Sequence, residues 1–208
     1  MVEEGGRPTP DPEEFDLLSA QLRRQLTLMF SRNVADDVLF VRVMVEEYQH
    51  AAGLAKQGRL AETRRALAAL RDDISPPSGA ELSLVLEVAA LPVWSLLLWK
   101  EGDASRADAA LSAALQACAC LAEDWNHDYL TLKQLHLAMN IARVQGSTGD
   151  GKSAEALLAM LEAAVFGDRS AWPFAGGDRL SIPLTGLERE VALGELKRVR
   201  RRLRAVAI

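Results

Sequence analysis

The sequence predicts an all-α protein in which antiparallel helical hairpins pack side by side. Long segments with apolar residues at helical spacing alternate with short turns that contain glycine or proline. Three turns, at Gly58, Gly102 and Gly149, each separate a long apolar helix from a second helical segment. No run of residues in the sequence has the two-residue alternation of a strand. At 208 residues, the chain is long enough for one stack of hairpins or, as the alternative, one compact helical bundle.

The N-terminal half begins with a short lead and continues with four helical segments. Residues 1–10 are expected to be disordered, and residues 11–208 to form a single helical-repeat domain. Asp11 and Pro12 are typical of a helix N-terminus. Pro92, inside the fourth segment, predicts a kink or a break because it removes one backbone hydrogen bond. The four expected helices span residues 11–30, 34–57, 59–72 and about 80–101.

The segment Leu82–Trp99 is almost wholly apolar and close to the length that spans a bilayer. Glu87 and Pro92 interrupt it, and the sequence contains no second segment of this kind. A helix that is apolar on every side is also typical of the centre of a helical stack. We therefore expect a buried helix here and no membrane partner.

The C-terminal half predicts three more helices, a loop and a capping helix. The three helices span residues 105–124, 129–145 and 153–166. A loop is expected at residues 167–183, and a capping helix at 185–206 begins with the capping-box spacing of Thr185 and Glu188. In the capping helix, six basic residues between Lys197 and Arg204 flank an apolar seam. We expect the seam to dock on its own chain, with a homodimer seam or an anionic partner as alternatives.

Composition and charge argue against several classes of protein function. Apolar residues make up 49% of the chain and charged residues 25%, which is typical of a folded globular protein. The net charge of −5 argues against a nucleic-acid partner, because phosphate binding needs clustered positive charge. The acidic N-terminus lacks the features of a secretion signal, so we expect a cytoplasmic protein. Cys118 and Cys120 point to different sides of a helix, which favours reduced thiols over a disulfide.

The stretch GSTGDGKS, residues 146–153, has the spelling of a phosphate-binding loop. Such a loop needs a buried strand before it and a helix after it, so that backbone amides face the phosphates. Here the preceding residues have helical spacing, and no later strand could supply an aspartate for magnesium. We expect a helix-to-helix turn with Lys152 exposed. A nucleotide site at Lys152 remains an alternative.

Two acid–histidine pairs have the spacing of metal ligands on a helix. Glu47 and His50 form one pair, and Asp124 and His127 form the other. Glu14 and Glu87 could complete a di-metal site, which keeps an enzyme or ligand-binding bundle as the alternative function. This spacing also arises by chance on charged helices. We therefore expect no metal and no cofactor, and no serine–histidine–acid pattern identifies a catalytic residue.

The helices that follow the three glycine turns share a pattern of small and apolar residues. Its positions are Thr63, Leu67 and Leu70 in the first helix, Ala107, Leu111 and Ala114 in the second, and Ala154, Leu158 and Leu161 in the third. Over residues 34–166 this pattern resembles the tetratricopeptide repeat, whose paired helices stack into an α-solenoid. The middle unit, Val88–Leu121, fits best. The turns are 44 and 47 residues apart, longer than the family's unit of about 34, so the resemblance implies a divergent, long-helix form.

In the tetratricopeptide family, the first helix of each hairpin lines a concave groove that binds a peptide or a helix. The resemblance places Tyr48, Ala52, Lys56, Leu96, Trp99, Lys100, His136, Met139 and Arg143 in this groove. Such an aromatic and basic groove implies an acidic or carboxylate-ending protein or peptide partner with an apolar anchor. The alternative is that Trp99 and Met139 fill the core. A sensor domain like those of bacterial transcription activators is a further alternative, suggested by fold analogy.

Two aromatic residues, Trp172 and Phe174, flank Pro173 in the expected loop. Large aromatic side chains that lie side by side are rarely exposed without a partner. We expect them to be buried, with the loop acting as a plug in the groove or as a lid over the end of the stack.

Overall fold

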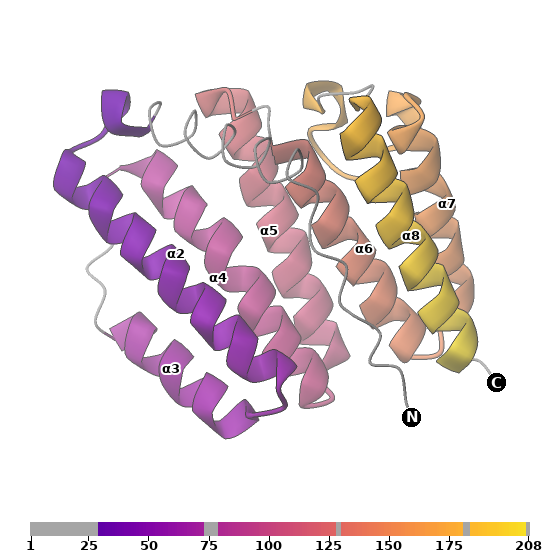
Figure 1. Cartoon of the computed structure of the whole chain (residues 1–208), viewed down its shortest axis with the longest axis horizontal. Coiled ribbons are helices and arrows are strands. Elements are labelled where there is room, and N and C mark those ends of the chain that lie inside the picture. The colour runs from indigo at the N-terminus through magenta and orange to yellow at the C-terminus, as the bar shows by residue number, and fades with distance from the viewer. Residues whose placement is uncertain (1–28, 73–78, 128–129, 181–183, 207–208) are drawn as a thin grey trace, which may run out of the picture.

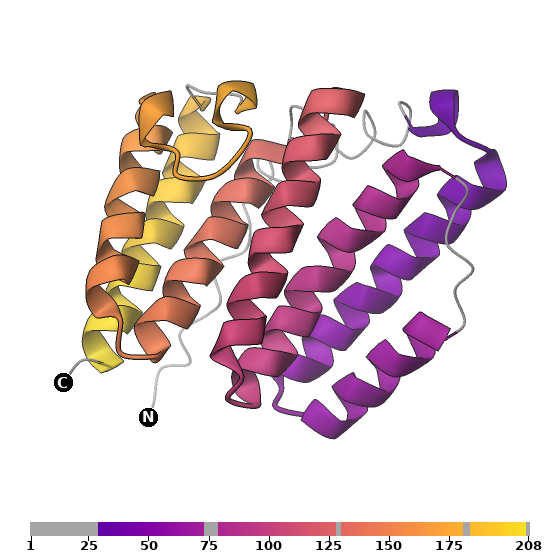
Figure 2. The ribbon, with the colours of Figure 1, turned by 180° about the vertical axis from the view of Figure 1, so that it is seen from behind.

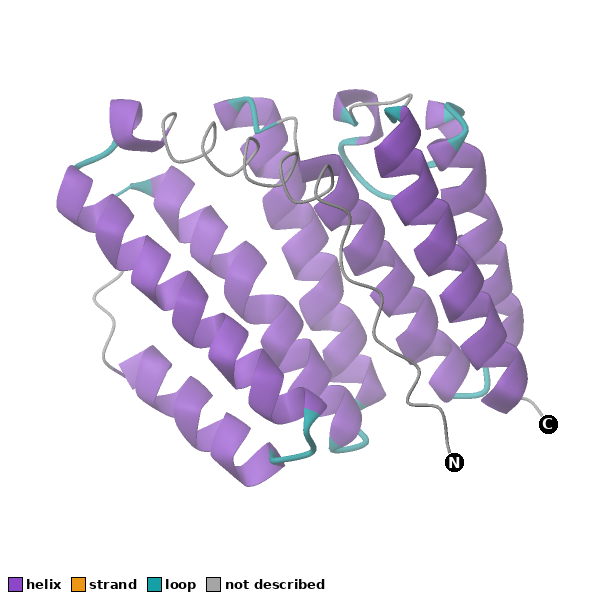
Figure 3. Ribbon diagram, in the orientation of Figure 1, coloured by secondary structure: helices purple, strands orange, loops and turns teal. Residues whose placement is uncertain are grey.

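The computed structural model of the chain describes residues 29–72, 79–127, 130–180 and 184–206. Within these ranges the chain forms α-helices, turns and two short 3-10 helices, with no strand (Figure 3). The predicted all-α class is confirmed. The expected disordered lead and nearly all of the first expected helix lie outside the described residues.

Successive helices pair as neighbours. The α-helices are α2 (Ala35–Lys56), α3 (Leu60–Asp72), α4 (Ala80–Lys100), α5 (Ala104–Trp125), α6 (Thr131–Ser147), α7 (Gly151–Val165) and α8 (Gly186–Val206). Hairpins form between α2 and α3, α4 and α5, and α6 and α7, while α8 packs against both α6 and α7. Helices α2, α4 and α8 lie on the side turned to the viewer in Figure 1. Helices α3, α5 and α7 lie on the opposite side, which Figure 2 shows.

The three predicted glycine turns have one geometry. Gly58, Gly102 and Gly149 adopt φ values of +79°, +89° and +88°, which favour glycine because it has no Cβ. In each turn the N–H of the following residue donates to a carbonyl five residues back, as in a Schellman motif. The predicted turns are confirmed. A fourth turn with the same hydrogen bond occurs at Gly167, where the sequence also reads Gly-Asp.

The helices after these turns bury the predicted small and apolar residues. Thr63, Ala107 and Ala154 have no exposed surface, and neither do Ala114 and Leu158. Small side chains allow neighbouring helices to approach closely, so these positions set the packing of each hairpin. Helix α4 continues through Pro92, and the break that was one expectation there does not occur.

Helix α4 separates two apolar cores. One core contains Leu82, Leu86 and Leu97 of α4 together with side chains from α2 and α3. The other joins Val88 of α4 to α5, α6, α7 and α8. In the described part of the chain, α4 is also the one helix long and apolar enough to cross a membrane, a test that a core helix passes too. The expected absence of a membrane partner stays a prediction.

The loop after α7 carries the two aromatic residues into the second core. Trp172 is 7% exposed, and its ring meets Phe174 edge to face with centroids 5.4 Å apart. The 3-10 helix η2 (Arg169–Ala171) packs on α7, and η3 (Gly177–Arg179) packs on α5. The predicted burial of Trp172 is confirmed. The loop covers α5 and α7, which differs from the expected plug in a groove lined by the first helices of the hairpins.

Candidate functional site

A cavity of about 1150 Å³ lies between α2, α4, α6 and α8. Helix α4 supplies more of the apolar wall than any other helix, and α2, α6 and α8 add further apolar side chains. This wall includes Val45, Ala52, Val85, Val88, Ala89, Pro92, Leu96, Leu137 and Leu203. Pro92 belongs to this wall, so the residue that weakens the helix backbone lies at the candidate site.

One face of α6 supplies a polar stripe along the opposite wall. The stripe consists of Lys133, His136, Asn140, Arg143 and Ser147, all of which line the cavity. The spacing of three, four, three and four residues keeps these side chains on one side of a helix. The cavity is therefore mainly apolar along α4, whereas α6 contributes this polar stripe together with apolar side chains.

The charged residues around the cavity are all basic. Lys56 from α2 and Arg202 from α8 join Lys133 and Arg143 of the stripe, and none of the described lining residues is acidic. Glu195 of α8 reaches Arg143 from outside this lining, with 3.4 Å between Arg143 Nη2 and Glu195 Oε2. One carboxylate therefore faces four cationic side chains, and an anionic ligand would complement them.

The surroundings lower the pKa of three basic groups in the stripe. Burial lowers the pKa of Lys133, Arg143 and His136, and the charges of Arg143 and Lys133 lower that of His136 further. The His136 side chain is exposed to the cavity, so water screens part of this effect. Each shift shows that the positive charge is disfavoured when the cavity holds no counterion.

Arg143 and Trp99 fix the end of the cavity near the C-terminus of α6. Arg143 donates to Asn140 Oδ1 and Glu195, while its buried Nε has no acceptor among the described residues. Trp99 Nε1 donates to Ser147 Oγ at 2.8 Å, which joins α4 to α6. The indole and the guanidinium are thereby held in place before any ligand binds.

The structure brings together most of the residues that the repeat register placed in a groove. Tyr48, Lys56, Trp99, His136 and Arg143 line the cavity, as do Ala52 and Leu96. Lys100 and Met139 are absent from this lining. Met139 is 3% exposed and belongs to the core, as the alternative interpretation expected, whereas Lys100 is exposed at the end of α4. That the lining residues bind a partner stays a prediction.

Two lining cations were missed. The resemblance placed His136 and Arg143 in the groove, and Lys133, three residues before His136, lies on the same face of the helix and could have been added by helical spacing. Arg202 could not be found in this way, because its position depends on how α8 packs against α6.

The acid–histidine pairs do not form a metal site in the described residues. Glu47 and His50 are exposed on α2, and Glu87 is exposed on α4. Among the residues that the structure describes, no three acid, histidine or cysteine side chains are grouped to hold a metal ion. Glu14, the remaining candidate ligand, lies outside them.

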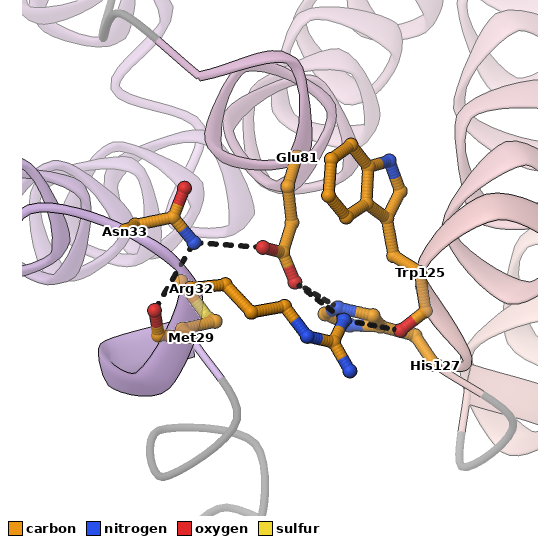
Figure 4. Close-up of polar contacts among 6 residues, drawn as sticks. All are labelled: Met29, Arg32, Asn33, Glu81, Trp125 and His127. Atoms are coloured by element: carbon orange, nitrogen blue, oxygen red, sulfur yellow. Dashed lines mark hydrogen bonds and ion pairs between the residues drawn. The ribbon is translucent and has the colours of Figure 1, made fainter.

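His127 instead joins a buried cluster with Glu81 (Figure 4). Both side chains have no exposed surface, and His127 Nε2 lies 2.7 Å from Glu81 Oε1. Asn33 Nδ2 donates to Glu81 Oε2 at 2.7 Å, and Arg32 reaches Glu81 Oε1 at 3.4 Å and the Trp125 carbonyl at 2.6 Å. The cluster ties the segment before α2 to the start of α4 and the end of α5, a structural role.

The GSTGDGKS stretch forms the predicted turn. Helix α6 ends at Ser147 and α7 begins at Gly151, so a helix precedes the turn where a phosphate site needs a strand. Asp150 caps α7 by accepting a hydrogen bond from the Ser153 N–H at 3.1 Å. A carboxylate therefore already occupies the helix N-terminus that would face a phosphate, and Lys152 is exposed.

The chain matches no protein-family model, no curated protein and no solved structure. The arrangement of the residues around the cavity therefore carries the functional argument.

Proposed function

We propose that the chain is an interaction module that binds an acidic, amphipathic peptide segment of a partner protein in the cavity between α2, α4, α6 and α8. The observation that carries this proposal is the lining itself, which combines an apolar wall with four cationic side chains and, among the described residues, no acid. An acidic peptide with apolar anchors would bury its apolar side chains on α4 and pair its carboxylates with α6.

The cavity is large enough to hold a short peptide segment. Pockets for drug-sized molecules enclose about 300–1,000 Å³, and this cavity encloses about 1150 Å³. Trp99 and Tyr48 add aromatic surface of the kind that dominates peptide recognition. Support also comes from the resemblance to tetratricopeptide repeats, in which the first helices of the hairpins form the binding surface, because α2, α4 and α6 are the first helices of the three hairpins here.

A selection with a phage-displayed library of random peptides tests the proposal. We expect the enriched peptides to contain acidic residues together with aromatic or aliphatic ones. The tightest peptide is then titrated against the double variant Lys56→Ala/Arg202→Ala, which removes two lining charges. We expect a loss of about tenfold or more, because each charge-assisted contact contributes roughly 1.5–3 kcal/mol when it is desolvated.

A matched double variant separates the cavity from net charge. Lys100→Ala/Lys152→Ala removes the same charge at two exposed positions outside the described lining. We expect this control to bind the peptide as the unmodified protein does. Enrichment of peptides without acids, or an equal loss in both double variants, would overturn the proposal.

A further inference from the structure

We propose that Lys133 is the anchor of the ligand in this cavity, a subsite for one carboxylate group, with His136 beside it one turn along α6. The inference rests on the proposed function in one respect, because both place an anionic ligand in the same cavity. It adds which charge of the ligand is recognised and which residue recognises it.

Lys133 has no counterion among the residues that the structure describes. The residue is half-buried in the cavity wall, and its ammonium forms no hydrogen bond or ion pair with the described residues. The titratable group that acts on it is the Cys118 thiol of α5, and burial raises the pKa of that thiol to about 12. Cys118 is therefore uncharged at neutral pH and does not neutralise the lysine.

The position of Lys133 in its helix adds to this imbalance. Lys133 is the third residue of α6, and the first turn of α6 contains no acidic residue. The N-terminus of a helix carries a partial positive charge, which makes a cation there unfavourable and an anion favourable. An incoming carboxylate would be stabilised by both the ammonium and the helix end.

The charged groups around Lys133 and His136 are mostly positive, so they favour the binding of one negative charge. Lys56 comes from α2, Arg143 from α6 itself, and Arg202 from α8. Glu195 of α8 is the acid that faces this group, and it is already bonded to Arg143. A carboxylate bound at Lys133 would therefore meet mainly cationic side chains.

Binding at this subsite should take up protons. Burial and the charges of Arg143 and Lys133 lower the pKa of His136, so the neutral imidazole is favoured when the cavity holds no anion. A bound carboxylate favours the charged imidazole and raises this pKa. Protons therefore move from buffer to protein as the ligand binds, which a merely structural lysine would not cause.

Titration calorimetry with octanoate and 1-octanol tests the anchor, because these probes share an apolar chain and differ in charge. We expect octanoate to bind about tenfold more tightly than octanol. Lys133→Met and Lys133→Gln should each abolish this preference, whereas Lys133→Arg should retain it. Lys100→Met, at an exposed lysine outside the described lining, should leave the preference unchanged. Titrations in two buffers of different ionisation enthalpy should show proton uptake that both neutral variants reduce.

The outcomes separate this inference from the proposed function. If octanoate is not preferred, or if the neutral variants keep the preference, Lys133 is not the anchor. Selected acidic peptides that bind Lys133→Met as tightly as the unmodified protein would leave the peptide function standing and overturn the anchor. A preference for octanoate that depends on Lys133, without enrichment of acidic peptides, would support the anchor and overturn the peptide function.

Discussion

Asp150 determines what the GSTGDGKS turn can do. Its carboxylate accepts hydrogen bonds from Ser153, and these bonds lower the pKa of the Asp150 carboxyl. The same backbone N–H would have to face a phosphate in a nucleotide site, and the capping carboxylate would repel that phosphate. A single side chain thus converts the spelling of a phosphate-binding loop into a helix cap.

Lys152→Ala should therefore leave both stability and ligand affinity nearly unchanged, because Lys152 is exposed in the first turn of α7. Urea unfolding and titration with ATP in the presence of magnesium check this. Saturable, magnesium-dependent ATP binding that the substitution removes would contradict the assignment of the turn.

His136 should make stability depend on pH. Burial and the neighbouring cations lower its folded-state pKa below the ordinary value of about 6.5. The unfolded chain then binds more protons, so stability is highest above about pH 6.5 and falls as the pH drops toward the folded-state pKa. Urea unfolding of His136→Gln between pH 7.5 and 5.5 should give a flatter profile, with the exposed His50→Gln as the control. Identical slopes in His136→Gln and the unmodified protein would argue against this role.

Each helical hairpin depends on small residues where its two helices meet. Ala107 and Ala114 have no exposed surface on α5, which packs closely on α4. Sequence spacing identified these positions because a helix places every third or fourth residue on one face. The three glycine turns were identified in another way, because glycine is favoured where a helix ends in a positive φ.

Ala114→Leu should overpack the contact between α4 and α5 and lower the free energy of unfolding by about 1–3 kcal/mol. Ala113→Leu is the matched control, because the neighbouring Ala113 is exposed on the same helix. Urea or thermal unfolding measures both. Equal stabilities of the two variants would show that α5 does not need a small residue at position 114.

Sequence spacing could not predict contacts between residues that are far apart in the chain. The Glu81–His127 contact links residues 46 apart, and His127 had been a candidate metal ligand because only its local spacing was visible. Trp172 was expected to be buried on account of its size, but its packing on α5 and α7 depends on the path of a loop. Local periodicity and turn composition therefore predicted the helices and the turns, and the repeat register predicted part of the cavity lining, whereas contacts set by tertiary packing had to come from the structure.

At the scale of the whole molecule, the loop after α7 contributes to stability. Trp172→Ala should lower the free energy of unfolding by about 3–5 kcal/mol, because it removes a large buried ring from the second core. Phe166→Ala, which alters a side chain that is 61% exposed, provides the comparison. Chemical denaturation checks both variants. A loss as small as that of Phe166→Ala would mean that the loop does not help to hold α5 and α7 together.

The division of the apolar interior by α4 has a consequence for how the protein opens. The α2–α3 side and the α5–α8 side share α4 and the Glu81 cluster, and each has its own apolar cluster. Such an arrangement favours partial opening, in which the α2–α3 hairpin exchanges its amide hydrogens as a separate cooperative unit. The cavity lies across this division, since Tyr48 belongs to one cluster and Leu137 to the other. A ligand that touches both would merge the two units into one, so the bound protein would exchange these amides more slowly and unfold in a single step.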